Sequence, residues 1–165
     1  DLLIALPSSG LHSNGFSLVR RVLDVERRDL RQRVDELGCS LGEALLTPTR
    51  IYVKPVTALL EAVDVHSLAH ITGGGFHENI PRSVPEGMGV RIRRAELRVP
   101  PIFEFLMREG GIDEEQMFHV FNMGVGMTAT VAEDDAEVAL RVLRENGVEA
   151  RPIGSVVDEE GVVLC

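Results

Sequence analysis

Short apolar runs of strand length alternate along this chain with amphipathic segments of helical spacing, and this alternation most restricts the possible fold. The strand-like runs are 2–6, 65–71, 88–92, 125–131, 151–157 and 162–164. The helix-like segments are 16–25, 30–37, 41–46, 55–63, 102–109, 113–120 and 133–145. Because the two kinds are interspersed over 165 residues, we expect an α+β fold, a mixed β-sheet layered with α-helices, in a single domain spanning residues 1–165.

Local signals add three finer expectations. Ser13 or Asn14 is a suitable cap for the helix that starts near Phe16. The charged segment 30–37 reads as a helix closed by Gly38. The last two strands, 151–157 and 162–164, are separated by the turn sequence "DEEG" and are expected to pair with each other.

Three glycine-bearing loops lie directly beside these elements, with the sequences "SSGLHSNG" (8–15), "TGGGFHEN" (72–79) and "FNMGVGM" (121–127). Glycines at such junctions expose backbone N–H groups, and beside a helix start they form a cradle for an anion. Tight turns and caps explain most such clusters, but three in one domain, one with a triple glycine, favour a binding site. The predicted ligand-binding residues are Ser9, Gly10, Ser13, Asn14, Gly73, Gly74, Gly75, Asn79, Asn122 and Gly124. Arg82 would add a charge suited to phosphate.

His12 lies inside the first loop and is the candidate catalytic residue. A neutral imidazole there could hydrogen-bond a substrate or move a proton near neutral pH. A serine hydrolase is the weaker interpretation, because the chain has no G-x-S-x-G motif. His66 and His70 have the i, i+4 spacing of metal ligands on a helix, but their segment reads as a strand, so no metal site is predicted.

Charge and composition exclude several classes of function. The formal net charge is −9 and the sequence pI is about 5.0, which argues against nucleic acid as a partner. No apolar run reaches the length of a membrane span, so no membrane partner is expected. The two cysteines, Cys39 and Cys165, are far apart and outside any C-x-x-C pair, which favours reduced thiols and a cytoplasmic protein.

Four segments together resemble one family: "SSGLHSNGFSLVR", "LLTPTRIYVKPV", "AHITGGGFHENIPR" and "FNMGVGM". The chain resembles the C-terminal domain of aminoimidazole ribonucleotide synthetase, also called phosphoribosylformylglycinamidine cyclo-ligase. The four motifs occur in the order found in that family and span most of the chain. The resemblance implies an ATP-dependent ligase of purine biosynthesis that closes the imidazole ring of formylglycinamidine ribonucleotide. Its products would be aminoimidazole ribonucleotide, ADP and phosphate.

The resemblance also implies how the work is divided. ATP and Mg²⁺ would be bound mostly by an N-terminal domain, which would also form a homodimer in the full-length enzyme. The residues carried over as one wall of the substrate pocket are Ser9, Gly10, His12, Ser13 and Asn14. Gly73, Gly74, Gly75 and Asn79 would approach phosphate or ribose, and Asn122 and Gly124 would line the other side. Arg50, Tyr52 and Lys54 match a family segment, with a role that could be structural.

The chain begins at Asp1 without a methionine and enters an apolar run at once, so we expect it to be part of a longer protein and inactive by itself. Two alternatives stay open. One is another ATP-dependent member of the same superfamily, such as formylglycinamidine ribonucleotide synthetase or selenophosphate synthetase. The other is a noncatalytic binding module whose glycine loops are only turns.

Overall fold

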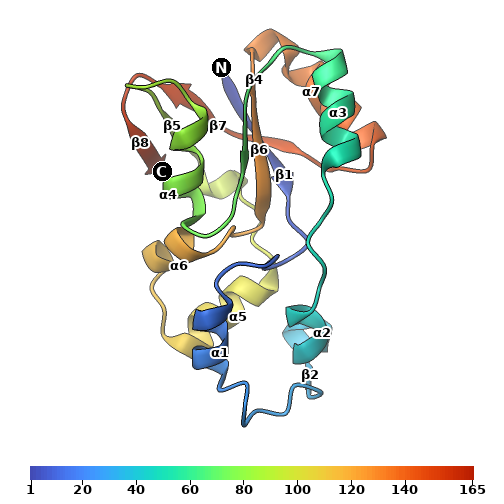
Figure 1. The fold of residues 1–165 in the computed structure, drawn as a ribbon, viewed down its shortest axis with the longest axis vertical. Coiled ribbons are helices and arrows are strands. Elements are labelled where there is room, and N and C mark those ends of the chain that lie inside the picture. Colours follow the sequence, from blue (N-terminus) through green and yellow to red (C-terminus); the bar gives the residue numbers. More distant parts are fainter.

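A computed structural model describes all 165 residues and contains one six-stranded mixed sheet in the order β4-β6-β1-β7-β5-β8 (Figure 1). The strands of this sheet are β1 (Leu2–Pro7), β4 (Val65–His70), β5 (Gly89–Ile92), β6 (Val125–Val131), β7 (Arg151–Val157) and β8 (Gly161–Leu164). Strands β2 (Arg33–Val34) and β3 (Cys39–Ser40) form a separate two-stranded ribbon. All pairings in the large sheet are antiparallel except β5 with β8. The predicted fold class, a mixed sheet layered with helices, is confirmed.

Seven α-helices surround the sheet. They are α1 (Phe16–Leu23), α2 (Leu41–Leu45), α3 (Val53–Ala62), α4 (Gly75–Asn79), α5 (Pro101–Gly110), α6 (Glu114–Val120) and α7 (Ala136–Glu145). Single 3-10 turns cover Asp35–Leu37, Pro81–Ser83, Arg94–Glu96 and Glu133–Asp135. None of these helices combines the length and the apolar character that crossing a bilayer requires.

The central strand β1 is apolar on both faces because helices cover both sides of the sheet. Its alternate residues Ile4 and Leu6 join a core cluster that includes side chains of α3 and α7. Leu3 and Ala5 point the other way, into a larger cluster that continues among α1, α2, α4, α5 and α6. A strand buried on both faces reads as a continuous apolar run rather than an alternating one, as the sequence "LLIAL" does.

Two local expectations, for segment 30–37 and for the cap of the first helix, differ from the structure. Segment 30–37 does not form the expected α-helix: Arg33–Val34 pairs with β3, and the Leu30 carbonyl accepts a hydrogen bond from the Gly42 N–H at 2.8 Å. These backbone bonds outweigh exposed i, i+4 charge pairs, which contribute only a few tenths of a kcal/mol each. Only Asp35–Leu37 forms a single 3-10 turn, which Gly38 ends as expected. Helix α1 has Gly15 as its N-cap residue, and neither Ser13 nor Asn14 caps it.

The final strands also differ from the expected hairpin. β5 lies between β7 and β8 and pairs with both of them. Gly89 of β5 permits this arrangement, because a side chain there would overlap the carbonyl oxygens of Glu159 and Gly161. The turn after β7 therefore passes over β5 instead of folding β8 back onto β7.

Candidate functional site

The three glycine loops gather at one end of the large sheet. Strands β1 and β4 both run antiparallel to β6, and they flank it on its two sides. The loop after β1, the loop after β4 and the loop before β6 therefore lie at the same end of these three strands, the lower end in Figure 1. We call this end the site edge of the sheet. The sequence predicted that these loops share a pocket, and the topology brings them to one edge.

Asn122 joins the first loop to the third. Its side chain is fully buried, and its Oδ1 accepts hydrogen bonds from the Ser8 hydroxyl and the Gly124 N–H, both at 2.9 Å. Its Nδ2 donates to the Gly10 carbonyl at 2.9 Å. Every polar atom of this side chain is thus engaged within the protein. Asn122 organises the loops, and a direct role in ligand binding stays a prediction.

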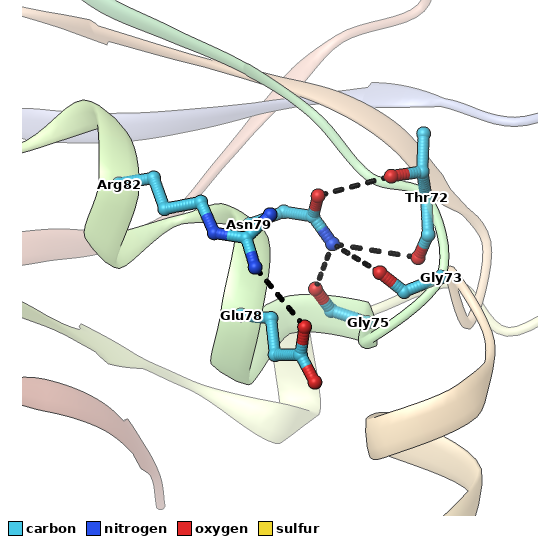
Figure 2. Close-up of polar contacts among 6 residues, drawn as sticks. All are labelled: Thr72, Gly73, Gly75, Glu78, Asn79 and Arg82. Atoms are coloured by element: carbon cyan, nitrogen blue, oxygen red, sulfur yellow. Dashed lines mark hydrogen bonds and ion pairs between the residues drawn. The ribbon is translucent and has the colours of Figure 1, made fainter.

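The second loop is held by Asn79 in a similar way (Figure 2). The Asn79 Nδ2 donates to the carbonyls of Gly73 (3.2 Å) and Gly75 (2.7 Å), and its Oδ1 accepts from the Thr72 hydroxyl at 3.0 Å. Arg82, expected to supply charge to a phosphate, instead donates to Glu78 at 3.1 Å.

The triple glycine has local causes that the sequence did not reveal. Gly74 and Gly75 have φ values of 90° and 57°, which favour glycine. A Cβ on Gly75 would overlap the carbonyl oxygen of Phe118, at the end of α6. Only Gly73 faces open space. Packing and backbone conformation therefore account for two of the three glycines, and close approach of a ligand stays a prediction for Gly73.

The first loop is also tied to the segment between α2 and α3. The Ser9 hydroxyl donates to the Pro48 carbonyl at 2.6 Å, and the Ser13 and Thr49 hydroxyls lie 3.4 Å apart. Gly10 adopts φ 145°, and the Asn14 N–H donates to the Leu11 carbonyl at 3.4 Å. The roles of these loop residues as ligands stay predictions.

His12 is the most unusual residue of this edge. It is 4% exposed and adopts a left-handed φ of 57°. Its Nε2 accepts hydrogen bonds from the N–H groups of Ser9 (3.1 Å) and Arg50 (3.5 Å). A nitrogen that accepts must be unprotonated, so the proton is assigned to Nδ1, which is buried and has no partner. An orphaned buried donor costs about 1–3 kcal/mol.

Burial lowers the pKa of His12 to about 4, with smaller contributions from His70 and Arg50. The imidazole is therefore neutral at pH 7. Of the two roles predicted from sequence, these features favour hydrogen bonding through the Nδ1–H over proton transfer near neutral pH.

Two further aromatic side chains converge on His12. The ring centroids of His12, Tyr52 and His70 lie 6.2–6.4 Å apart. The Tyr52 hydroxyl donates to the Pro7 carbonyl at 2.8 Å, and burial raises the Tyr52 pKa above its usual range, so the phenol stays protonated. A side chain on Gly126 would overlap the Tyr52 hydroxyl.

His70 is the residue that sequence reasoning missed. Its spacing from His66 suggests only a metal ligand, yet it closes this cluster with His12 and Tyr52. The available signal was its position as the last strand residue before the triple glycine. His66 instead pairs with Asp1 at 2.8 Å.

The low pKa of His12 predicts an acid-dependent loss of stability. Below pH 6.5 the unfolded chain takes up a proton at this residue and the folded chain does not. Its contribution to stability is therefore intact above pH 6.5 and declines as pH falls to about 4. Between pH 7 and 4 the wild type should lose about 2–3 kcal/mol more than His12→Asn, a residue that tolerates the left-handed backbone. Urea unfolding at each pH measures this difference. Replacing the exposed His66 by Gln is the control, and equal acid slopes for wild type and His12→Asn would contradict the assignment.

Comparisons with known proteins agree with this architecture. Residues 1–164 match the family described as AIR synthase related protein, C-terminal domain. The chain is 52% identical over 165 residues to phosphoribosylformylglycinamidine cyclo-ligase of Shouchella clausii (strain KSM-K16), covering 99% of this chain and 48% of the relative. It is 50% identical over 167 residues to the protein of the same name from Caldicellulosiruptor bescii, with coverage of 99% and 49%.

Solved structures show the same fold at low sequence identity. The crystal structure of Escherichia coli HypE matches with a TM-score of 0.61 and 22% identity, covering 99% of this chain and 47% of that one. Thiamine monophosphate kinase from Aquifex aeolicus matches with a TM-score of 0.56 and 16% identity, with coverage of 99% and 50%. The chain spans about half the length of the curated relatives it matches. The family model matches 164 of the residues, and these relatives are about 50% identical to the chain. The chain therefore belongs to the family of AIR synthase related proteins and corresponds to their C-terminal domain.

Proposed function

We propose that this chain is the C-terminal, substrate-cleft domain of a phosphoribosylformylglycinamidine cyclo-ligase. The full-length enzyme would use ATP to close the imidazole ring of formylglycinamidine ribonucleotide, in the cytoplasm. The observation that carries the proposal is the meeting of three glycine loops at one sheet edge, beside a buried His12 donor without a partner. The identity of about 50% to relatives of that name supports this reaction over those of HypE and thiamine monophosphate kinase, which are 22% and 16% identical.

This chain offers no cluster of protein ligands for a magnesium ion. No group of three or more His, Cys, Asp or Glu side chains is placed to hold a metal ion. We therefore propose that Mg²⁺ and most of the ATP contacts belong to the other half of the full-length protein. The homodimer implied by the family resemblance stays a prediction.

What this chain would contribute is binding and orientation. Arg50 lies close enough to His12 and Tyr52 to influence both, and no carboxylate lies within 4 Å of its guanidinium. An unpaired guanidinium that acts on His12, whose Nδ1–H has no partner, suits the phosphate of a ribonucleotide. The neutral His12 would donate its Nδ1–H to the substrate after a small movement of the loop. Phosphoryl transfer depends mainly on such positioning and needs no protein nucleophile.

A chimaera tests the proposal. In it, this chain replaces the matched half of the Shouchella clausii cyclo-ligase, and turnover of formylglycinamidine ribonucleotide is measured. We expect an active chimaera, no turnover by the 165 residues alone, and a kcat/KM about 10–100-fold lower in His12→Asn, as for a lost buried hydrogen bond. His66→Gln should leave kcat/KM unchanged, and thermal unfolding checks that each variant is folded.

The opposite results would each remove part of the proposal. A folded chimaera without turnover would favour the noncatalytic module or another reaction. Turnover by the 165 residues alone would contradict the division between two halves. Unchanged kinetics in His12→Asn would remove His12 from the site.

A further inference from the structure

Helix α3, the segment before it and Met127 of β6 form an apolar surface, which we call the α3 face and define as Ile51, Val53, Val56, Leu60 and Met127. Ile51 is 81% exposed, Val53 72% and Leu60 53%, while Val56 and Met127 are partly buried. Leu46, also exposed, belongs to the same stretch of chain. Every large hydrophobic side chain that the structure leaves exposed thus falls within residues 46–60. A gathering of this kind marks an interaction surface.

The helical spacing shows that this surface is not a by-product of core packing. Pro55 and Leu59 are buried, and Leu59 belongs to the core cluster shared with α7. Val53, Val56 and Leu60 follow the i, i+3, i+7 pattern on a different face of the helix. A surface helix needs one apolar stripe, toward its own core. Helix α3 has a second one, in which Val53 and Leu60 are exposed and Val56 is partly buried.

The α3 face is continuous with the candidate site. Ile51, Val53, Val56 and Met127 line a cavity of about 360 Å³. The same cavity is lined by Tyr52 and His70 of the aromatic cluster and by Arg50. Whatever covers the α3 face therefore also closes one side of the candidate site.

The charge of this region differs from that of the rest of the chain. The net charge of the whole chain is −9, yet residues 44–60 contain Arg50 and Lys54 and no Asp or Glu. Neither cation has a carboxylate within 4 Å. A partner for this surface would present an apolar centre with acidic groups at its edge. The same face of a second copy fits poorly, because a symmetric dimer would bring Arg50 and Lys54 of one copy toward those of the other.

We propose that the α3 face docks against the amino-terminal half of the full-length cyclo-ligase and that this contact completes the wall of the active-site cleft. The matched family is a C-terminal domain, and the matched region is 48–49% of each relative, so about half of each relative lies outside it. The inference goes beyond the proposed reaction, because it assigns a surface of this chain to a partner.

Site-specific alkylation of introduced cysteines tests the contact. Ile51→Cys and Val53→Cys are each made in the 165-residue chain and in the chimaera with the Shouchella clausii amino-terminal half. The alkylation rate of each site is followed by peptide mass spectrometry, which separates it from Cys39 and Cys165. Both sites should react at least about 10-fold more slowly in the chimaera than in the chain alone. Gln116→Cys, an exposed residue of α6, should change by less than about twofold.

Three results would overturn the proposal. One is equal alkylation of Ile51→Cys and Val53→Cys in the chain alone and in the chimaera. Another is protection in the chain alone that grows with protein concentration, which would assign the α3 face to a second copy. The third is an alkylation rate of Gln116→Cys that falls in the chimaera as much as the rates of Ile51→Cys and Val53→Cys do. Such a general slowing would reflect the labelling reaction rather than a contact at the α3 face. Turnover by the chimaera is recorded separately, so an active chimaera without protection refutes the docking and leaves the proposed function intact.

Discussion

Replacing Gly75 by Ala should destabilise this protein strongly, whereas the same change at Gly73 should have almost no effect. Gly75 has a left-handed φ of 57°, and a Cβ there would overlap the Phe118 carbonyl oxygen. The left-handed backbone costs about 1–2 kcal/mol for a residue with a Cβ, and forced overpacking adds about 1–3 kcal/mol. We therefore expect a total of about 3 kcal/mol, which in a domain of this size lowers the melting temperature by about 6–12 °C.

Gly73 is the matched control, since it lies two residues away in the same loop. Its φ is not positive, and a Cβ there would meet nothing within 4 Å. Gly73→Ala should change the free energy of unfolding by less than about 1 kcal/mol, and it restricts the unfolded chain slightly. Urea unfolding of both variants measures the difference. Equal losses would show that this loop does not pack against α6 as described. If Gly73→Ala instead abolishes ligand binding in the chimaera with its stability intact, the close approach of a ligand to Gly73 is supported.

Much of the fold could be predicted because several elements carry their own local signal. Strand β6 was predicted with its observed bounds, Val125–Val131, from alternating small and β-branched residues. Helix α7 ends at Glu145, before the Asn146-Gly147 pair that signals a stop. The helix predicted for segment 30–37 was wrong, because the structure of this segment depends on backbone hydrogen bonds to residues 39–42. Such bonds leave no periodic pattern in the sequence.

The partners of strands were beyond the reach of sequence for a related reason. A strand's own residues report which faces are buried, and they do not report its neighbours in the sheet. β8 has the composition of a strand, and nothing in residues 161–164 reveals that β5 separates it from β7.

The candidate site shows the same division between what is local and what is not. The glycine loops were visible in the sequence. The sequence does not show that the side chains of Asn79 and Asn122 hold loops together. Their hydrogen-bond partners Thr72, Ser8 and Gly10 are brought to them only by the fold. An asparagine side chain in a glycine loop can hydrogen-bond either a ligand or the backbone of the loop itself, which it then braces. The distinction matters for mutagenesis, since a loop brace changes stability and a ligand contact changes affinity.

Asn122 is therefore the residue whose replacement should cost the most among the predicted site residues. Asn122→Ala leaves three buried groups without their partner: the Ser8 hydroxyl, the Gly124 N–H and the Gly10 carbonyl. Each orphaned group costs about 1–3 kcal/mol. We expect a loss of about 4 kcal/mol in the free energy of unfolding, because some of these groups relax toward water, and a fall of about 8–16 °C in melting temperature.

Asn146→Ala is the matched control for Asn122→Ala, because the Asn146 Nδ2 makes a single hydrogen bond, to the Val142 carbonyl at 2.9 Å. It should cost about 1 kcal/mol. Hydrogen exchange adds a local readout: the Ser8 N–H, which donates to the Gly124 carbonyl at 2.9 Å, should lose protection in Asn122→Ala and keep it in Asn146→Ala. Equal losses of stability in the two variants, with the Ser8 amide still protected, would mean that the first and third loops are held together by packing rather than by this side chain. In that case the conformation of the loops around His12 would be fixed by the apolar side chains packed beneath them.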